Sequence, residues 1–436
     1  SILISDLKNC FKKRLLIFLP VGFFSGLPLL LTSATLGTWL ADLGVNKTTI
    51  GLFALVGMPY ALKFLWAPLL DIKILNFFSN RVGIRRVWII IMQILICINI
   101  FIIGNINPVE DTKILAFTAL TLAFFSASHD VAIDAWRIEI HKKSEYGLGA
   151  AMYVTGYRIA LLVAGAGALI IAEIFSWKVS FISLSALFPL GILLISFCNI
   201  KTNANDQDKA EINYKNFFKD RVIEPFKDFM NKNNWVLILV FIALFKWGDA
   251  LLGVLAQPFM LEIGFTKSEI ATISKLYGLG ATLVGLFLGG LIISRLGIIL
   301  SLFIAGILQL LSNLVFIVLA IKGSSISLLV ITITIENLSG GIGTAAFIAY
   351  LSSLCNVQFS AFQYALLSSF MAFSRTWLAA PAGWLIDNLK WQRYFENFGI
   401  NQINNPEWVG FFIITALFCL PAIILIYYID NKRKIN

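Results

Sequence analysis

Long apolar stretches alternate with short polar segments along the whole chain. A helix needs about 20 apolar residues to cross the hydrocarbon core of a bilayer, and about twelve stretches have that length. The pattern therefore predicts an all-α integral membrane protein with twelve transmembrane helices. The predicted spans are 15–40, 49–71, 87–104, 112–136, 147–175, 178–198, 235–261, 268–294, 297–321, 325–353, 361–387 and 408–429.

Composition agrees with this pattern, since 58% of the 436 residues are hydrophobic and only 13% are charged. Soluble proteins carry about a quarter charged residues. The net charge of +10 could suggest a nucleic-acid partner, but most Lys and Arg residues lie in the termini and loops on one side of the spans. This is the positive-inside distribution of membrane proteins. The expected surroundings are a lipid bilayer, and no nucleic acid is expected.

The polar connections predict two halves. Basic clusters precede the first span and follow the last, so both termini are expected on the cytoplasmic side. The longest polar segment separates the spans into six and six. We therefore predict a six-helix bundle over 1–198, a cytoplasmic linker over 199–234 and a second six-helix bundle over 235–436.

The two halves also resemble each other in sequence. "LADLGVNKTTI" (40–50) and "MLEIGFTKSEI" (260–270) join corresponding spans at an offset of 220 residues. Arg158 and Arg375 correspond at an offset of 217 residues, each in the fifth span of its half. Two parallel six-helix repeats are the architecture of major facilitator transporters.

Charged residues lie inside several predicted spans, where their transfer into lipid is costly. At 1.5 Å per residue, two of the basic groups lie about 16 Å into their spans, near the middle of the membrane. Charges at such depth mark substrate or ion pathways unless they form purely structural ion pairs. The basic groups are Lys63, Arg158, Lys246, Lys275 and Arg375, and the deep acids are Asp130, Asp249 and Glu336.

The excess of basic groups favours an anionic substrate, because an arginine fork binds carboxylate or phosphate with two hydrogen bonds. We expect Arg158 and Arg375 to face a central cavity from equivalent helices. Lys246 and Asp249 are three residues apart on one helix and so share a face. We expect them to pair with each other or with another charge, most favourably Glu336.

The segment "SASHDVAIDAWR" (126–137) ends the fourth span and carries two acids one turn apart. Asp130 is the deeper one, close to basic groups in neighbouring spans, and is our leading proton carrier ahead of Asp249 and Glu336. His129 is expected to be a positioning hydrogen-bond group. Near the end of the span, an ion-paired cytoplasmic gate is predicted from Asp71, Arg85, Arg86 and Asp134.

Enzyme motifs are weak in this chain. His129 and Asp134 have the H-x-x-x-x-D spacing of lipid acyltransferases, and Asp130 and Asp134 have the D-x-x-x-D spacing of prenyl transferases. Both patterns are common by chance, a second aspartate-rich motif is missing, and no P-loop motif occurs. The five Cys residues have no metal-ligand spacing. An intramembrane transferase or a membrane sensor is a minor alternative, and neither metal nor cofactor is predicted.

Several segments in order along nearly the whole chain resemble the AmpG-type muropeptide permeases of the major facilitator superfamily. They are "GFFSGLPLLLTSATLGTWL" (22–40), "KFLWAPLLD" (63–71), "FFSASHDVAIDAW" (124–136), "GYR" (156–158), "FKWGDA" (245–250), "ENLSGGIGTAAFIAYLSSLCN" (336–356), "FSAFQYALLS" (359–368) and "AGW" (382–384).

This resemblance implies a proton-driven importer of cell-wall turnover products, GlcNAc-anhydro-muramyl peptides, in the bacterial inner membrane. The expected partners are a small anionic substrate, the proton and the lipid bilayer, and the expected state is a monomer. The related acetyl-CoA transporters share part of the pattern and are the second interpretation. The substrate-binding candidates are Lys63, Trp66, Arg158, Lys246, Trp247 and Arg375.

Overall fold

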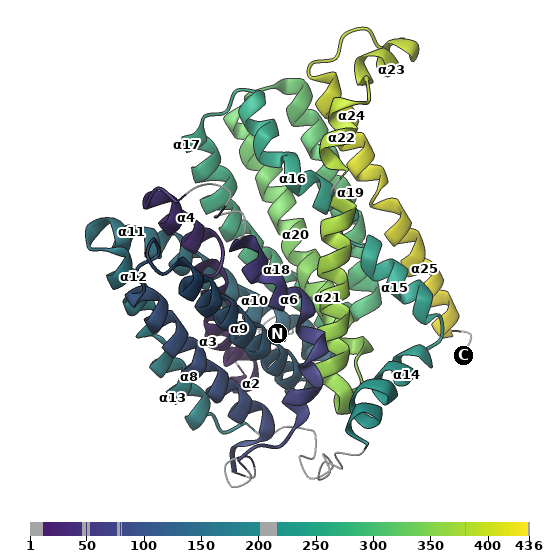
Figure 1. Cartoon of the computed structure of the whole chain (residues 1–436). Helices are drawn as coiled ribbons and strands as arrows, with labels where there is room; N and C mark the ends of the chain where they lie inside the picture. The colour runs from purple at the N-terminus through teal and green to yellow at the C-terminus, as the bar shows by residue number, and fades with distance from the viewer. Residues whose placement is uncertain are drawn as a thin grey trace. The chain divides into compact units, whose positions relative to one another are not determined.

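All regular secondary structure in the described residues is helical (Figure 1). A computed structural model describes residues 12–45, 49, 53–75, 79, 81–200, 216–379 and 381–434. The predicted linker 199–234 therefore lies partly, and the second half of the 40–50 repeat segment mostly, outside the described residues.

Ten helices in the described residues are long and apolar enough to cross a membrane. This agrees with ten of the twelve predicted spans. Their bounds are Lys13–Asp42, Ile84–Asn105, Thr112–Ile140, Lys143–Ile174, Trp177–Phe197, Trp235–Glu262, Ile270–Leu296, Ile298–Lys322, Ile326–Leu354 and Pro406–Ile429.

The other two predicted spans are also helical but are interrupted. Proline has no backbone N–H and ends or kinks a helix. The span predicted at 49–71 consists of short pieces that contain Pro59 and Pro68, and the span predicted at 361–387 is divided at Pro381. The pieces are η1 (Phe53–Gly57), α6 (Met58–Leu62), η2 (Lys63–Leu65), η3 (Ala67–Asp71), α21 (Ser360–Ala379) and α22 (Ala382–Asp387). The fold class predicted from the sequence is confirmed.

Contacts divide the chain into two compact units. The first contains Ser1–Met230 together with Leu351–Ser369, and the second contains Asn231–Tyr350 together with Phe370–Asn436. The boundary near Met230 falls inside the predicted linker. One short segment of the predicted second bundle, 351–369, groups with the first unit by its contacts, and we call it the crossing segment.

The first unit is built around two closely packed helices, α3 (Phe18–Leu31) and α10 (Tyr146–Leu162). Gly22 and Gly156 permit this approach. A Cβ atom at Gly22 would lie 2.0 Å from the backbone oxygen of Tyr153, and one at Gly156 would lie 1.8 Å from that of Leu19. Small residues bring membrane helices together in this way.

The remaining elements of the first unit surround this pair, with α9 packed against α8 and α3. They are α2 (Lys13–Leu16), α4 (Ala34–Asp42), α8 (Ile84–Asn105), α9 (Thr112–Ile140), η4 (Lys143–Glu145), η5 (Val163–Gly167), α11 (Ala168–Ile174), α12 (Trp177–Ser185), α13 (Phe188–Phe197), η7 (Lys219–Ile223), α14 (Glu224–Met230) and η9 (Val357–Phe359).

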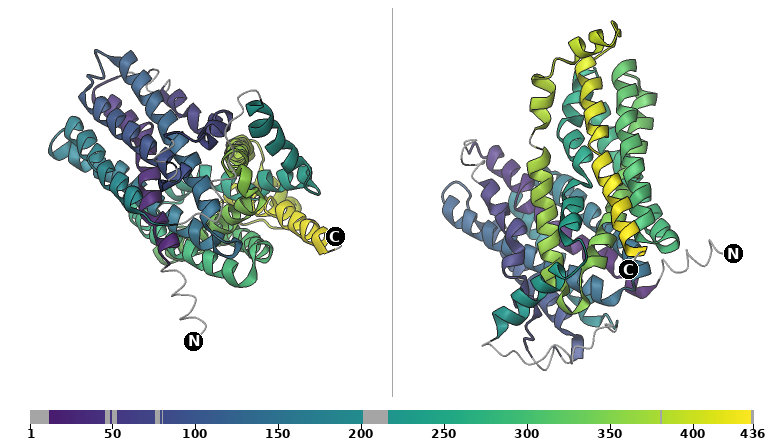
Figure 2. Two further views of the ribbon diagram at one scale, coloured as in Figure 1. Left: turned by 90° about the horizontal axis from the view of Figure 1, so that it is seen from below. Right: turned by 90° about the vertical axis from the view of Figure 1, so that its right-hand side faces the viewer.

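In the second unit, α24 (Pro406–Leu417) and α25 (Leu420–Lys434) pack along α19 (Ile298–Lys322), as Figures 1 and 2 show. Buried aromatic residues such as Phe259, Phe316 and Phe412 form its core. The other elements are α15 (Trp235–Leu244), α16 (Trp247–Glu262), α17 (Lys267–Glu269), η8 (Ile270–Tyr277), α18 (Gly278–Leu296), α20 (Ile326–Leu354, whose end is in the crossing segment) and α23 (Trp391–Asn397).

Candidate functional site

A buried carboxyl group lies in the middle of the first unit. Asp130 on α9 is 8% exposed, and Ser25 Oγ on α3 donates a hydrogen bond to its Oδ1. Ser25 Oγ also lies 2.7 Å from the hydroxyl of Tyr153 on α10. Lys63 on η2 lies within electrostatic range of both Asp130 and Asp134. Four separate elements therefore place polar side chains around one acid.

His129 precedes Asp130 on α9, but its side chain does not share the hydrogen bonds of that acid. Its side chain is fully buried, and neither ring nitrogen has a hydrogen-bond partner among the described residues. The structure does not provide the hydrogen bond that the sequence predicted for His129.

A second buried cluster centres on Arg85, which is 2% exposed. Its Nη2 lies 2.5 Å from Asp71 Oδ1 and 2.9 Å from Glu139 Oε1, and its Nη1 donates to the carbonyl of Leu70 at 3.0 Å. Ser360 of the crossing segment donates to the same Glu139 oxygen at 2.9 Å. One guanidinium thus contacts two buried carboxylates, and Arg221 on η7 also lies 3.9 Å from Asp71 Oδ2.

Asp134 has a different partner from the predicted one. It lies 3.6 Å from Arg137 Nη2, one turn further along α9. Arg137 is fully buried, donates to Ser352 Oγ at 3.0 Å and lies over the ring of Tyr364 at 5.2 Å. Arg86 donates to the carbonyl of Cys198.

Of the predicted gate residues, the structure therefore pairs Asp71 with Arg85 and places Asp134 beside Arg137. Sequence reasoning missed Arg137 and Glu139. Their signal was present, since two charged residues continue the apolar helix beyond Asp134, but their partners are distant in the chain.

The substrate-binding candidates of the first unit differ in their contacts and exposure. Trp66 Nε1 donates to Ser128 Oγ at 2.9 Å, and its ring packs on Phe124 with centroids 4.7 Å apart. Arg158 is exposed on α10. Lys63 is half-buried near Asp130. Their role in binding remains a prediction.

The second unit holds another polar group around the start of α16. Lys246 Nζ donates to Thr344 Oγ1 at 2.9 Å, and Asp249 accepts from Asn313 Nδ2 at 3.2 Å. Asp249 lies within electrostatic range of Lys246 and of Glu336. Glu336 also lies within electrostatic range of Lys275. The pairing of Lys246 and Asp249 with each other or with Glu336 stays a prediction, and Lys246 and Asp249 have additional neutral partners.

Trp247 and Arg375 complete the candidates of the second unit. The Trp247 ring stacks on Phe418 with centroids 4.1 Å apart, and its Nε1 donates to the carbonyl of Leu378 at 3.1 Å. Arg375 is exposed and lies within electrostatic range of Asp249. These contacts hold the Trp247 side chain in place, and a role of Trp247 or Arg375 in substrate binding stays a prediction.

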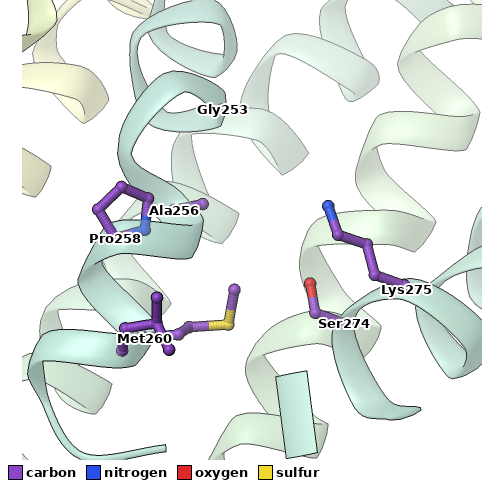
Figure 3. Close-up of a pocket in the computed structure, with 7 residues that line it drawn as sticks. Gly253, Ala256, Pro258, Met260, Ser274 and Lys275 are labelled. Atoms are coloured by element: carbon purple, nitrogen blue, oxygen red, sulfur yellow. The ribbon is translucent and has the colours of Figure 1, made fainter. Parts of the chain in front are cut away.

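A pocket of about 400 Å³ lies between α16 and η8 in the second unit. Figure 3 shows Ser274 and Lys275 on one side of it, with Ala256, Pro258 and Met260 on the helix at the other side. Pro258 lies inside α16, where it removes one backbone N–H from the helix, and η8 is a π-helix. Lys275, which was identified in the sequence as a span charge, is the cationic group of this pocket.

No group of three or more metal-ligating side chains occurs in the part of the chain that is described. The arrangement of apolar helices with buried charges is that of a major facilitator transporter. The fold matches the Escherichia coli fucose:proton symporter with a TM-score of 0.66 at 12% identity, covering 94% of this chain and 97% of that one. A human organic anion transporter matches with a TM-score of 0.60 at 14% identity, covering 93% and 99%.

Sequence relatives define the family more closely. The chain is 36% identical over 422 residues to a Rickettsia felis protein named putative transporter AmpG 4, covering 95% of this chain and 96% of that protein. It is 38% identical over 383 residues to the Escherichia coli anhydromuropeptide permease, covering 88% and 76%. The chain belongs to the AmpG-type permease family and is a multi-pass membrane transporter. The family described as acetyl-coenzyme A transporter 1 matches residues 14–175.

Proposed function

We propose that this transporter imports anionic muropeptides, GlcNAc-anhydro-muramyl peptides, into the cytoplasm by proton symport with alternating access. It acts as a monomer in the bacterial inner membrane, with both termini in the cytoplasm. The observation that carries the proposal is a buried carboxyl group, Asp130, held by Ser25 and near Lys63 inside a helix bundle related to a permease for anhydromuropeptides.

The basic groups of the two units bind the substrate's peptide carboxylates. Lys63, Arg158, Lys246 and Arg375 supply the positive charge, and Trp66 and Trp247 supply apolar surface for the sugar rings. An arginine fork matches a carboxylate, whereas lysine supplies a point charge. Arg158→Lys and Arg375→Lys should each raise the KM for uptake by about tenfold, for a loss of about 1.4 kcal/mol. Unchanged KM in both variants would argue against direct binding.

Asp130 carries the coupled proton, with Asp249 and Glu336 as the next candidates. A buried acid takes up a proton when nearby cations move away and releases it when they return. Lys63 is the cation in range of Asp130, so substrate binding to Lys63 would loosen its hold on the carboxylate and favour protonation. This links the proton to an anionic substrate without a direct contact between them.

The ion pairs around Arg85 form the cytoplasmic gate. The predicted gate residues are Asp71, Arg85, Arg86 and Asp134. Glu139 pairs with Arg85 and Arg137 lies beside Asp134, and these two residues contact serines of the crossing segment at 2.9 and 3.0 Å. The crossing segment joins α20 and α21, which continue into the second unit. Breaking these contacts would release the gate.

The direct test is uptake of labelled anhydromuropeptide into proteoliposomes with and without an imposed proton gradient. Uphill uptake that needs the gradient, and that Asp130→Asn abolishes while counterflow persists, supports the proposal. Accumulation against a gradient by Asp130→Asn would place the proton elsewhere.

Acetyl-CoA is the second candidate substrate, because the acetyl-coenzyme A transporter family matches residues 14–175. It is also anionic and would meet the same basic groups. Labelled acetyl-CoA in the same vesicles separates the two, since the proposal requires preference for the muropeptide.

A further inference from the structure

Ser25 and Tyr153 meet Asp130 because two helices approach unusually closely. Gly22 and Gly26 on α3 and Gly156 on α10 leave no room for side chains between the helix backbones. Ser25 lies on α3 beside this close contact between the helices and is buried, with 1% of its surface exposed. The glycines therefore fix the distance between the Ser25 and Tyr153 hydroxyls.

The hydrogen bonds have a defined direction when Asp130 is ionised. A carboxylate only accepts hydrogen bonds, so Ser25 must donate its one hydrogen to Asp130. Ser25 Oγ then accepts, and the Tyr153 hydroxyl 2.7 Å away donates to it. Two aligned hydroxyl groups thus stabilise the charged form of the acid.

We propose that Ser25 and Tyr153 are positioning residues that set the proton affinity of Asp130 and change their hydrogen-bond direction with its protonation. This proposal rests on the proposed function of Asp130. When Asp130 gains a proton on Oδ1, it becomes a donor to Ser25 Oγ. The Ser25 hydrogen turns to the Tyr153 oxygen, and the Tyr153 hydrogen turns away. Each hydroxyl keeps its own hydrogen, and the only proton gained is on Asp130.

The consequence concerns α3 and α10. In the ionised state Tyr153 donates towards α3, and in the protonated state its hydrogen is free to find another acceptor. The protonation state of Asp130 is therefore transmitted to two helices that carry other candidate groups, among them Arg158 on α10. This links proton uptake to the helix that presents a substrate-binding arginine.

Other titratable and charged groups also face Asp130. Lys63 on η2 and Asp134 on α9 act on it through their charges, and Tyr60 on α6 and Tyr157 on α10 lie within electrostatic range. Ser25 differs from all four because it is joined to the carboxyl by a hydrogen bond. Removing it should therefore move the pH dependence without changing the surrounding charges.

The experiment compares Ser25→Ala, Tyr153→Phe and the control Tyr157→Phe. A hydrogen bond to a charged group is lost in Ser25→Ala, so the pH midpoint of muropeptide uptake should move towards alkaline pH by about one unit. Tyr153→Phe should move it in the same direction by less. Tyr157→Phe removes a hydroxyl one turn away on the same helix and should leave the midpoint in place.

A second measurement does not depend on the substrate. Infrared difference spectra of the purified protein after pH steps report the protonated-carboxyl band that Asp130→Asn removes. The band's midpoint should shift in Ser25→Ala and Tyr153→Phe as uptake does. If the band titrates identically in all three hydroxyl variants, Ser25 and Tyr153 do not set the proton affinity of Asp130. The proposal for these two residues is then overturned, while Asp130 remains the proton carrier. A band unchanged by Asp130→Asn, with uphill uptake intact, overturns instead the proposed role of Asp130 as proton carrier, on which this proposal rests.

Discussion

At the residue scale, several buried charged side chains of this transporter, among them Arg85, Glu139 and Arg137, are held by specific hydrogen bonds and ion pairs. Arg85 illustrates the cost of such an arrangement. Burying a guanidinium and two carboxylates is expensive, and the ions offset it only when all are present in good geometry. The cluster is therefore sensitive to loss of any one member.

Arg85→Gln should destabilise the protein by about 3–5 kcal/mol, because it removes the buried guanidinium that lies 2.5 Å from Asp71 and 2.9 Å from Glu139. Thermal unfolding in detergent measures this as a large fall in Tm. Arg86→Gln is the matched control, since Arg86 is less buried and donates to the carbonyl of Cys198. An equal fall in both variants would contradict the assignment of Arg85 as the centre of the cluster.

His141, in the short connection between α9 and η4, gives a pH prediction. Burial lowers the pKa of its ring from 6.5 to about 4, even though its Nε2 lies 2.8 Å from the carbonyl of Arg14. The unfolded chain takes up a proton below about pH 6.5 while the folded one stays neutral. Stability from this group is therefore complete above that pH and is lost as the pH falls towards 4.

The expected loss over this interval is roughly 2–4 kcal/mol. Thermal unfolding measured between pH 7 and pH 4 should show it, and His141→Gln should flatten that part of the curve. An unchanged slope in His141→Gln would show that other groups cause the acid sensitivity.

At the element scale, much of the fold could be predicted because apolar length and helix formation are local properties. The interruptions of the span predicted at 49–71 follow from Pro59 and Pro68, which the sequence displays. The polar partners could not be predicted. Glu139 meets Ser360 and Arg137 meets Ser352 across separations of 221 and 215 residues. No periodicity within α9 encodes which distant helix will pack beside it.

The α3–α10 contact gives an element-scale prediction. Gly22→Ala should reduce stability and folded yield strongly, because its Cβ would lie 2.0 Å from a backbone oxygen that cannot move without displacing the helix. Gly167→Ala is the matched control in the same unit, since the nearest atom to its Cβ would be 3.9 Å away. Size-exclusion profiles and Tm in detergent compare the two. Similar behaviour of both variants would contradict the close packing.

At the scale of the whole molecule, the crossing segment is the part whose contacts do not follow the two sequence halves. Its serines bind Glu139 and Arg137, and its Gln363 donates to Asp228 at 2.8 Å. The proposed alternating access requires such contacts to form in one state and break in another. Under this proposal, the energy of these bonds sets part of the balance between the states.

The labelling rate of Cys355 in the crossing segment can report whether these contacts are formed, because Cys355 is only 9% exposed in the structure that contains them. In a chain whose other cysteines are replaced, Glu139→Gln should weaken the hydrogen bond from Ser360 and the pair with Arg85, and so favour the open gate. Labelling of Cys355 by a small maleimide should then become several-fold faster.

Glu224→Gln on α14 removes the same charge from an exposed pair with Lys227 and should leave the rate unchanged. Under the proposed function, saturating muropeptide should alter the rate in the parent protein, since a transported ligand shifts the two-state balance. Equal labelling rates in Glu139→Gln and Glu224→Gln would show that the Arg85 cluster stabilises the first unit without controlling the gate.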